Sequence, residues 1–160
     1  MHAENDTPSY TGLTKYTSEQ DGYALWLPLG WNRFEMESGR RGMIFSPHPT
    51  FSDVGFSVDK TNLPYAVSKD DLPLLREGFQ KGLANLPGAV IESLDEVVEE
   101  KILALEAKLT YLDQGQTKKR WIRIIYAGEA QLTLIAEGAP PEEFEYWLPM
   151  FYNIMTTMTI

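Results

Sequence analysis

The sequence predicts an α+β domain built on an antiparallel sheet. Residues 89–137 contain four strand-like stretches joined by short turns, which is typical of an antiparallel meander. Two other segments, Ser68–Leu86 and Glu142–Thr157, instead place apolar residues every three or four positions, as amphipathic helices do. The chain has 160 residues, of which 43% are hydrophobic, and this is enough for one domain with a sizeable core.

The chain begins with a polar, non-periodic stretch. We expect residues 1–13 to be a flexible lead-in and residues 14–160 to form the single domain. Within Tyr16–Trp31, Asp21-Gly22 is a turn pair, and the apolar residues after it alternate as one face of a strand. This stretch predicts structure and no chemistry.

Short strands and a helix follow. We expect strands within Trp31–Glu37, Met43–Ser46 and Asp53–Lys60, because apolar and polar residues alternate there between turn residues. The helix Ser68–Leu86 contains a proline near its start, where the missing backbone donor is tolerated. We therefore place its N-cap at Asp70 or Asp71 and not at Ser68.

The third meander strand, Trp121–Tyr126, carries apolar side chains on both faces. We expect Ile135 of the next strand to share the face of Trp121 and Ile125. Either a helix covers each face, or one face is an exposed patch for a partner; the first arrangement is the commoner.

The chain has 23 acidic and 14 basic residues, which gives a net charge of −9, and its pI is about 4.7. This balance favours solubility and argues against nucleic acid as a partner, because phosphates need a clustered basic surface. There is no cysteine and no apolar run long enough for a membrane span. His48 has no nearby partner for a metal or catalytic site apart from Asp53, and His2 lies in the lead-in, so we expect no catalytic, cofactor or metal residues. The compartment stays open between cytoplasmic and exported, with any signal segment absent from this sequence.

Two basic clusters are the candidate partner-binding residues. The stronger is the run Lys118-Lys119-Arg120 beside Trp121, and the weaker is the turn with Arg40 and Arg41. Either cluster would suit an acidic protein partner. The competing interpretation is that lysines at a strand edge discourage unwanted pairing and that the arginines are solvated.

The final helix has an aromatic and methionine stripe that includes Phe144, Phe151 and Met155. Such a stripe suits a plastic binding groove, but core packing explains it better.

Several short motifs resemble those of the PsbP-like superfamily, which includes the PsbP proteins, the Ran guanine-nucleotide release factors and the DcrB-like proteins. The resemblance covers about Tyr16–Ile160 and rests on these residues: Gly22-Tyr23, Pro28, Gly30, Trp31, Leu109-Thr110-Tyr111, Ile154 and Thr157-Met158-Thr159-Ile160. It implies an α/β/α sandwich, a central antiparallel sheet flanked by helices, with a binding or assembly role and no catalysis. The metal sites described for some PsbP proteins have no counterpart here.

Three functions remain open. The first is a noncatalytic protein-binding or assembly module of the PsbP-like type that docks an unidentified protein through the basic residues. The second is a DcrB-like adaptor or chaperone that shields apolar peptide segments. The third, a small hydrolase or metalloenzyme, has the least support, because two histidines and no cysteine leave few reactive groups. The oligomeric state does not follow from the sequence.

Overall fold

The computed structural model describes residues 8, 11–37, 39, 41–50 and 53–160. The predicted lead-in therefore falls mostly outside the described residues, as does Arg40. The first strand, β1, begins at Leu13. No helix within the described residues is long and apolar enough to cross a membrane.

A seven-stranded antiparallel sheet forms the centre of the fold, with the strand order β3-β4-β5-β9-β8-β7-β6. Its last four strands in sequence are the predicted meander, and the first of them has a β-bulge between Ile91 and Ser93. The strand bounds are as follows: β3 Asn32–Glu35, β4 Gly42–Ser46, β5 Val54–Asn62, β6 Val90–Val98, β7 Ile102–Asp113, β8 Gln116–Ala127 and β9 Ala130–Gly138.

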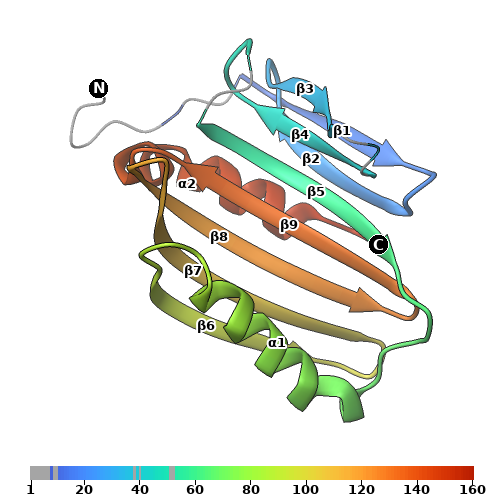
Figure 1. Cartoon of the computed structure of the whole chain (residues 1–160). Helices are drawn as coiled ribbons and strands as arrows, with labels where there is room; N and C mark the ends of the chain where they lie inside the picture. Colours follow the sequence, from blue (N-terminus) through green and yellow to red (C-terminus); the bar gives the residue numbers. More distant parts are fainter. Residues whose placement is uncertain (1–7, 9–10, 38, 40, 51–52) are drawn as a thin grey trace.

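One helix lies on each side of this sheet, as Figure 1 shows. Helix α1, Leu72–Ala84, packs over β6, β7 and β8 through residues such as Phe79 and Leu83. Helix α2, Pro141–Thr157, packs on the opposite face. The predicted sandwich of a central antiparallel sheet between helices is confirmed.

The main core lies between α2 and the sheet. Four phenylalanines are fully buried there together with aliphatic side chains of β5, β8 and β9. These phenylalanines are Phe45, Phe56, Phe144 and Phe151. The apolar stripe of the final helix is therefore mostly core, as the packing interpretation predicts.

The opening hairpin is a separate two-stranded sheet of β1, Leu13–Ser18, and β2, Tyr23–Pro28. Tyr23, Leu25 and Leu27 of β2 are buried in the main core beside α2. The C-terminal segment pairs with this hairpin: Ala24 and Thr159 exchange two backbone hydrogen bonds of 2.9 and 2.8 Å.

One sequence-based expectation is wrong. Ile135 lies opposite Ile122 in the register, so it shares the α1 side of the sheet and not the face of Trp121. The N-cap prediction, by contrast, is confirmed for α1. Ser68 caps only a separate, short 3-10 turn that precedes α1, where its side chain accepts a hydrogen bond from the Asp70 backbone N–H. Asp71 is then the N-cap residue of α1 itself.

Candidate functional site

The α1 side of the sheet is only partly covered. Helix α1 lies over β6 to β8, while no helix of the described chain lies over the same side of β3, β4, β5 and β9 (Figure 1). An open groove with a volume of about 760 Å³ occupies this uncovered half. That volume is within the range of ligand and peptide pockets in proteins.

The floor of the groove is a row of side chains that crosses the strands. The register aligns Phe34 with Ile44, Ile44 with Ser57, and Ser57 with Ile135. Paired residues of antiparallel strands point to the same face, so these four side chains form one line across the sheet. Phe34, Ile44 and Ile135 are half-buried, which leaves part of each apolar side chain in contact with water.

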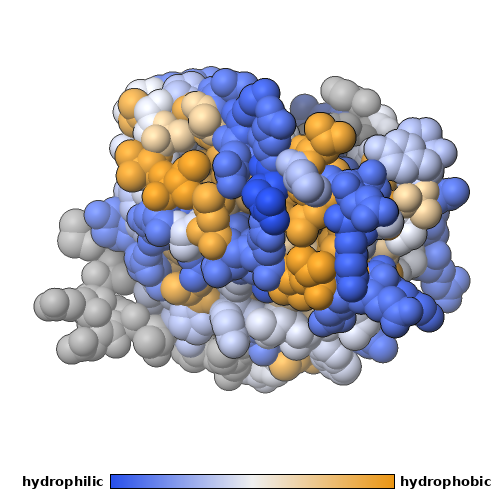
Figure 2. Space-filling model, turned by 90° about the horizontal axis from the view of Figure 1, so that it is seen from below, coloured by the Kyte–Doolittle hydropathy of each residue, from blue (hydrophilic) through white to orange (hydrophobic). Residues whose placement is uncertain are grey.

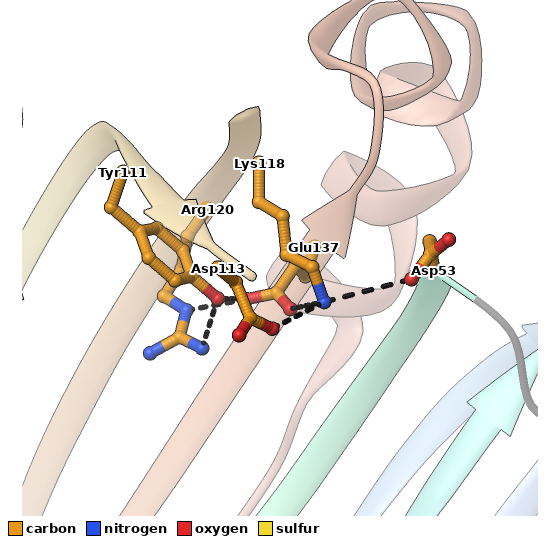
Figure 3. A network of polar contacts seen from close by, with 6 residues as sticks. All are labelled: Asp53, Tyr111, Asp113, Lys118, Arg120 and Glu137. Atoms are coloured by element: carbon orange, nitrogen blue, oxygen red, sulfur yellow. Dashed lines mark hydrogen bonds and ion pairs between the residues drawn. The ribbon is translucent and has the colours of Figure 1, made fainter. Parts of the chain in front are cut away.

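A polar network closes one end of the groove, and Figure 3 shows it at close range. The Lys118 ammonium lies 3.0 Å from an Asp113 carboxylate oxygen, 3.6 Å from Asp53 and 3.8 Å from Glu137. Arg120 donates to Glu137 at 2.6 Å through its Nε. Tyr111 donates its hydroxyl proton to Glu137 at 2.7 Å and accepts from Arg120 at 2.8 Å.

The β7–β8 hairpin explains why these residues meet. Its turn at Gln114-Gly115 has both residues at positive φ, which lets Asp113 pair with Gln116. The register then places Tyr111 opposite Lys118, while Arg120 lies opposite Glu137 of β9. Side chains alternate along a strand, so Lys118 and Arg120 point to the α1 side together.

The pKa values of both Lys118 and Tyr111 are raised in the network. Burial lowers the pKa of the Lys118 ammonium, but its hydrogen bond to Asp113 and the charge of Glu137 outweigh that effect, so the net pKa is raised. Burial raises the pKa of the Tyr111 hydroxyl, and the Glu137 carboxylate raises it further. At neutral pH the groove therefore presents a lysine cation and a neutral phenol. Among the described residues no cluster of three or more His, Cys, Asp or Glu side chains is arranged to hold a metal ion.

The predicted basic run is divided between the two faces of the sheet. Lys119 and Trp121 point to the α2 side, where Lys119 pairs with Glu92 at 2.9 Å and with Glu145 of α2. Trp121 is only 3% exposed. Its indole donates to Glu106, and its ring stacks on that of Tyr152 at 6.3 Å.

Arg41 lies away from this run. Its guanidinium is 2.8 Å from an Asp21 carboxylate oxygen at the turn between β1 and β2. The structure thus brings Lys118 and Arg120 together at the groove, and it separates Lys119, Trp121 and Arg41 from them. The partner-binding role of these residues stays a prediction.

Sequence reasoning missed most of the groove. Tyr111 and Asp113 come from β7, Glu137 comes from β9, and Asp53 directly precedes β5, so each had only a local interpretation as strand or turn. The one available signal was the hairpin turn at residues 113–116, which places Tyr111 and Lys118 opposite each other. The apolar row depends on pairings between distant segments and has no sequence signature.

The chain matches no known family profile, and no curated protein is similar to it in sequence. Solved structures, however, share its fold. Cyanobacterial PsbP (CyanoP) from Synechocystis sp. PCC 6803 aligns with a TM-score of 0.64 at 13% identity, covering 99% of each chain. LpqN of Mycobacterium tuberculosis, involved in cell envelope biogenesis, aligns at 0.62 and 15% identity over 92% of this chain and 90% of its own. The Ran-binding protein Mog1p of Saccharomyces cerevisiae aligns at 0.56 and 8% identity over 93% and 95%. The chain has the PsbP-like fold that its sequence motifs imply.

Proposed function

We propose that this chain is a noncatalytic protein-binding or assembly module and that an unidentified partner protein docks in the groove. The observation that carries the proposal is the half-exposed row of Phe34, Ile44 and Ile135, which ends at the cations Lys118 and Arg120. A protein interface typically joins an apolar, aromatic centre to a polar rim that contains arginine.

The groove suits a protein segment because of its shape and its charge. It is open along one side and spans five strands, so it admits a chain that passes through it. The apolar row would bury one or two partner side chains. Lys118 and Arg120 each have further N–H donors in addition to those that bind the carboxylates of the network. The partner would contribute an acidic or hydrogen-bonding group at that end.

The structural neighbours support a binding role. Mog1p, which has the same fold over nearly its whole length, is a Ran-binding protein. Because the identity is 8%, we transfer the kind of role and neither the partner nor its contact residues.

A steric variant tests the proposal. Ser57 is the small member of the row, so Ser57→Trp would fill the groove, while Thr17→Trp adds the same bulk at an exposed position of β1. Each protein would be used to capture partners from an extract of its native cell, followed by quantitative mass spectrometry. We expect a specific partner with the wild type and Thr17→Trp and its loss with Ser57→Trp. Capture of the partner by Ser57→Trp would refute the groove as the docking site, and the absence of any specific partner of the wild type would refute the function.

The second candidate is an adaptor that shields apolar peptide segments. The partial exposure of Phe34, Ile44 and Ile135 favours it, because these side chains could cover an apolar segment in the same groove. An environment-sensitive dye distinguishes the two functions. An adaptor would bind the dye in its folded state, lose it on Ser57→Trp and release it to many different apolar peptides, whereas a docking module would release the dye only to its specific partner.

A further inference from the structure

Strand β6 is an open edge of the seven-stranded sheet. It pairs with β7 on one side and is the last strand in the order, so its other side has no neighbour among the described strands. The opposite edge of the sheet, β3, has four residues, whereas β6 has nine. After the bulge near Ile91, its pairing with β7 is regular from Ser93 to Val98. Long edge strands are usually protected by charged side chains, above all lysine, by proline or by an irregular backbone. Residues 93–98 contain no lysine, proline or bulge, and their only charged residues are the acidic Asp95 and Glu96.

The backbone groups that point outward can be identified. Glu99 donates its backbone N–H to the carbonyl oxygen of Ile102 at 2.9 Å, so these two residues form a hydrogen-bonded pair. Bonded and non-bonded pairs alternate along an antiparallel ladder. Val98, Glu96 and Leu94 are therefore in non-bonded positions, and their N–H and C=O groups point away from β7.

The side chains of this edge form a distinct pattern. Leu94, Val97 and Val98 are 45%, 43% and 44% exposed. Figure 2, which views the molecule from below, shows apolar patches separated by hydrophilic residues on this face. One row along the edge contains Ser93, Asp95, Val97 and Glu99, and the other row contains Leu94, Glu96 and Val98.

The charges along the edge are all acidic. Five carboxylates and no basic residue lie between Val90 and Glu100. Arg76 of α1 binds Glu96 through two of its nitrogens. No ion pair of Asp95 or Glu99 occurs among the residues that the structure describes, so these two carboxylates give the edge its negative charge.

This charge disfavours a second copy of the chain as the neighbour. Antiparallel pairing of two copies about Glu96 would place two Glu96 carboxylates opposite each other, and like charges in that position are destabilising. Each copy would also carry a net charge of −9. A basic strand has the complementary charge.

We propose that β6 accepts an extended segment of a partner protein by antiparallel strand addition. The segment carries lysine or arginine opposite Asp95 and Glu99 and β-branched residues opposite Leu94, Val97 and Val98. Main-chain hydrogen bonds to Leu94, Glu96 and Val98 supply affinity, and the side-chain pattern supplies specificity. This inference rests on the proposed function as a protein-binding module and adds a second surface and a partner class to it.

The segment pattern can be tested with the labelled peptide Lys-Val-Val-Thr-Lys-Val-Thr, whose first residue would lie opposite Glu99 and whose last would lie opposite Ser93. Its fourth residue would face Glu96 and form main-chain hydrogen bonds, whereas its third would face Val97 and turn its N–H away. N-methylation of the fourth residue should weaken binding by about tenfold or more in fluorescence anisotropy, and N-methylation of the third should change it little. Equal effects of the two methyl groups, or no binding of the parent peptide, would overturn strand addition.

Variants of the protein provide the reciprocal test. Glu96→Pro removes an outward N–H without breaking the ladder to β7, and Glu96→Ala is its control because it also loses the contact with Arg76. We expect Glu96→Ala to bind the peptide and Glu96→Pro to lose it. Asp95→Lys should weaken binding, and replacing the fifth peptide residue by Glu should restore it. This charge exchange keeps the test valid even where the proline variant fails to fold, and binding unaffected by Asp95→Lys would refute the proposed register.

The outcomes separate this inference from the proposed function. Failure of the peptide to bind while the wild-type protein still captures a specific partner refutes strand addition alone. A peptide bound at β6 by a protein that captures no native partner refutes the proposed function instead.

Discussion

Arg120 contacts Tyr111 in two ways: its Nη2 donates to the phenol oxygen at 2.8 Å, and its guanidinium carbon lies 4.8 Å from the centre of the ring. Tyr111 in turn donates to Glu137, which Arg120 also binds. The three side chains form a closed triangle in which each one contacts the other two. The phenol oxygen thus acts as donor and acceptor at once, and removal of that one atom would remove two of the triangle's three hydrogen-bonded contacts.

Tyr111→Phe tests this triangle. The variant keeps the ring, which is 6% exposed, and loses both hydrogen bonds of the hydroxyl. We expect the free energy of unfolding in urea to fall by about 1–2 kcal/mol, because both bonds involve charged groups. Tyr152→Phe makes the same chemical change on a side chain that is 61% exposed and should be neutral. Equal losses for the two variants would contradict the structural role of the Tyr111 hydroxyl.

Lys118→Met removes the cation that three carboxylates share. At neutral pH Asp53, Asp113 and Glu137 would then repel one another, so we expect a loss of about 1 kcal/mol, a modest value because Asp53 and Asp113 are half-exposed. Because the folded-state pKa of Lys118 is raised above its unfolded value, its contribution should be fully present at neutral pH and should shrink as the pH rises above about 10. Urea unfolding of wild type and variant between pH 7 and 11.5 measures this difference, and a constant difference across the range would show that the lysine acts through packing alone.

Stability should fall at alkaline pH. Burial raises the folded-state pKa of Tyr23, Tyr111 and Tyr126 above the unfolded value of about 10. A raised pKa means that the folded state holds its protons longer, so this stability is fully present below about pH 10 and is lost as the pH rises above it. Each such group contributes a slope of up to about 1.4 kcal/mol per pH unit.

Tyr126→Phe provides the check on this alkaline effect, because burial is the sole cause of the raised pKa of Tyr126. The variant should lose less stability than the wild type between pH 10 and 11.5, as measured by urea unfolding and by tyrosinate absorbance. Parallel stability curves for the two proteins would argue against a contribution from this group.

Two Gly→Ala substitutions should have opposite signs. A Cβ atom at Gly138 would lie 2.5 Å from the backbone nitrogen of Phe144, so Gly138→Ala forces α2 away from the sheet and should cost about 2 kcal/mol or more. Gly82 lies in α1 with no atom within 4 Å of a Cβ, so Gly82→Ala should stabilise the protein by about 0.5–1 kcal/mol. Thermal and urea unfolding test both, and a tolerated Gly138→Ala would mean that α2 packs less closely than the structure shows.

Local patterns predicted the elements of the fold well, because hydrophobic period and turn chemistry are properties of neighbouring residues. The meander and both helices follow from them. Ile135 was placed on the wrong face because its orientation depends on its register with β8, and register is a property of two strands together. The order of the sheet, with β5 beside β9, likewise depends on contacts between distant segments.

The candidate site was predictable only in part. The basic run stood out because its residues are adjacent in sequence, but a strand sends adjacent side chains to opposite faces. Lys118 therefore reaches the groove, and Lys119 reaches Glu145 of α2. The groove itself exists because α1 does not extend over β9. The position of α1 is not a property of the β3 and β4 sequences, so these sequences do not reveal that their side of the sheet is uncovered.

The hydrogen bonds between Ala24 and Thr159 join the two ends of the domain, so they also determine when the chain can complete its fold during synthesis. During synthesis β2 leaves the ribosome first, yet the helix that buries Tyr23, Leu25 and Leu27 begins only at Pro141. At roughly 5–20 residues per second, the apolar side of the nascent hairpin is without its covering helix for on the order of 10 s. The main core therefore closes only after residues 141–159 have been synthesised, and a product truncated before Pro141 would expose an uncovered strand.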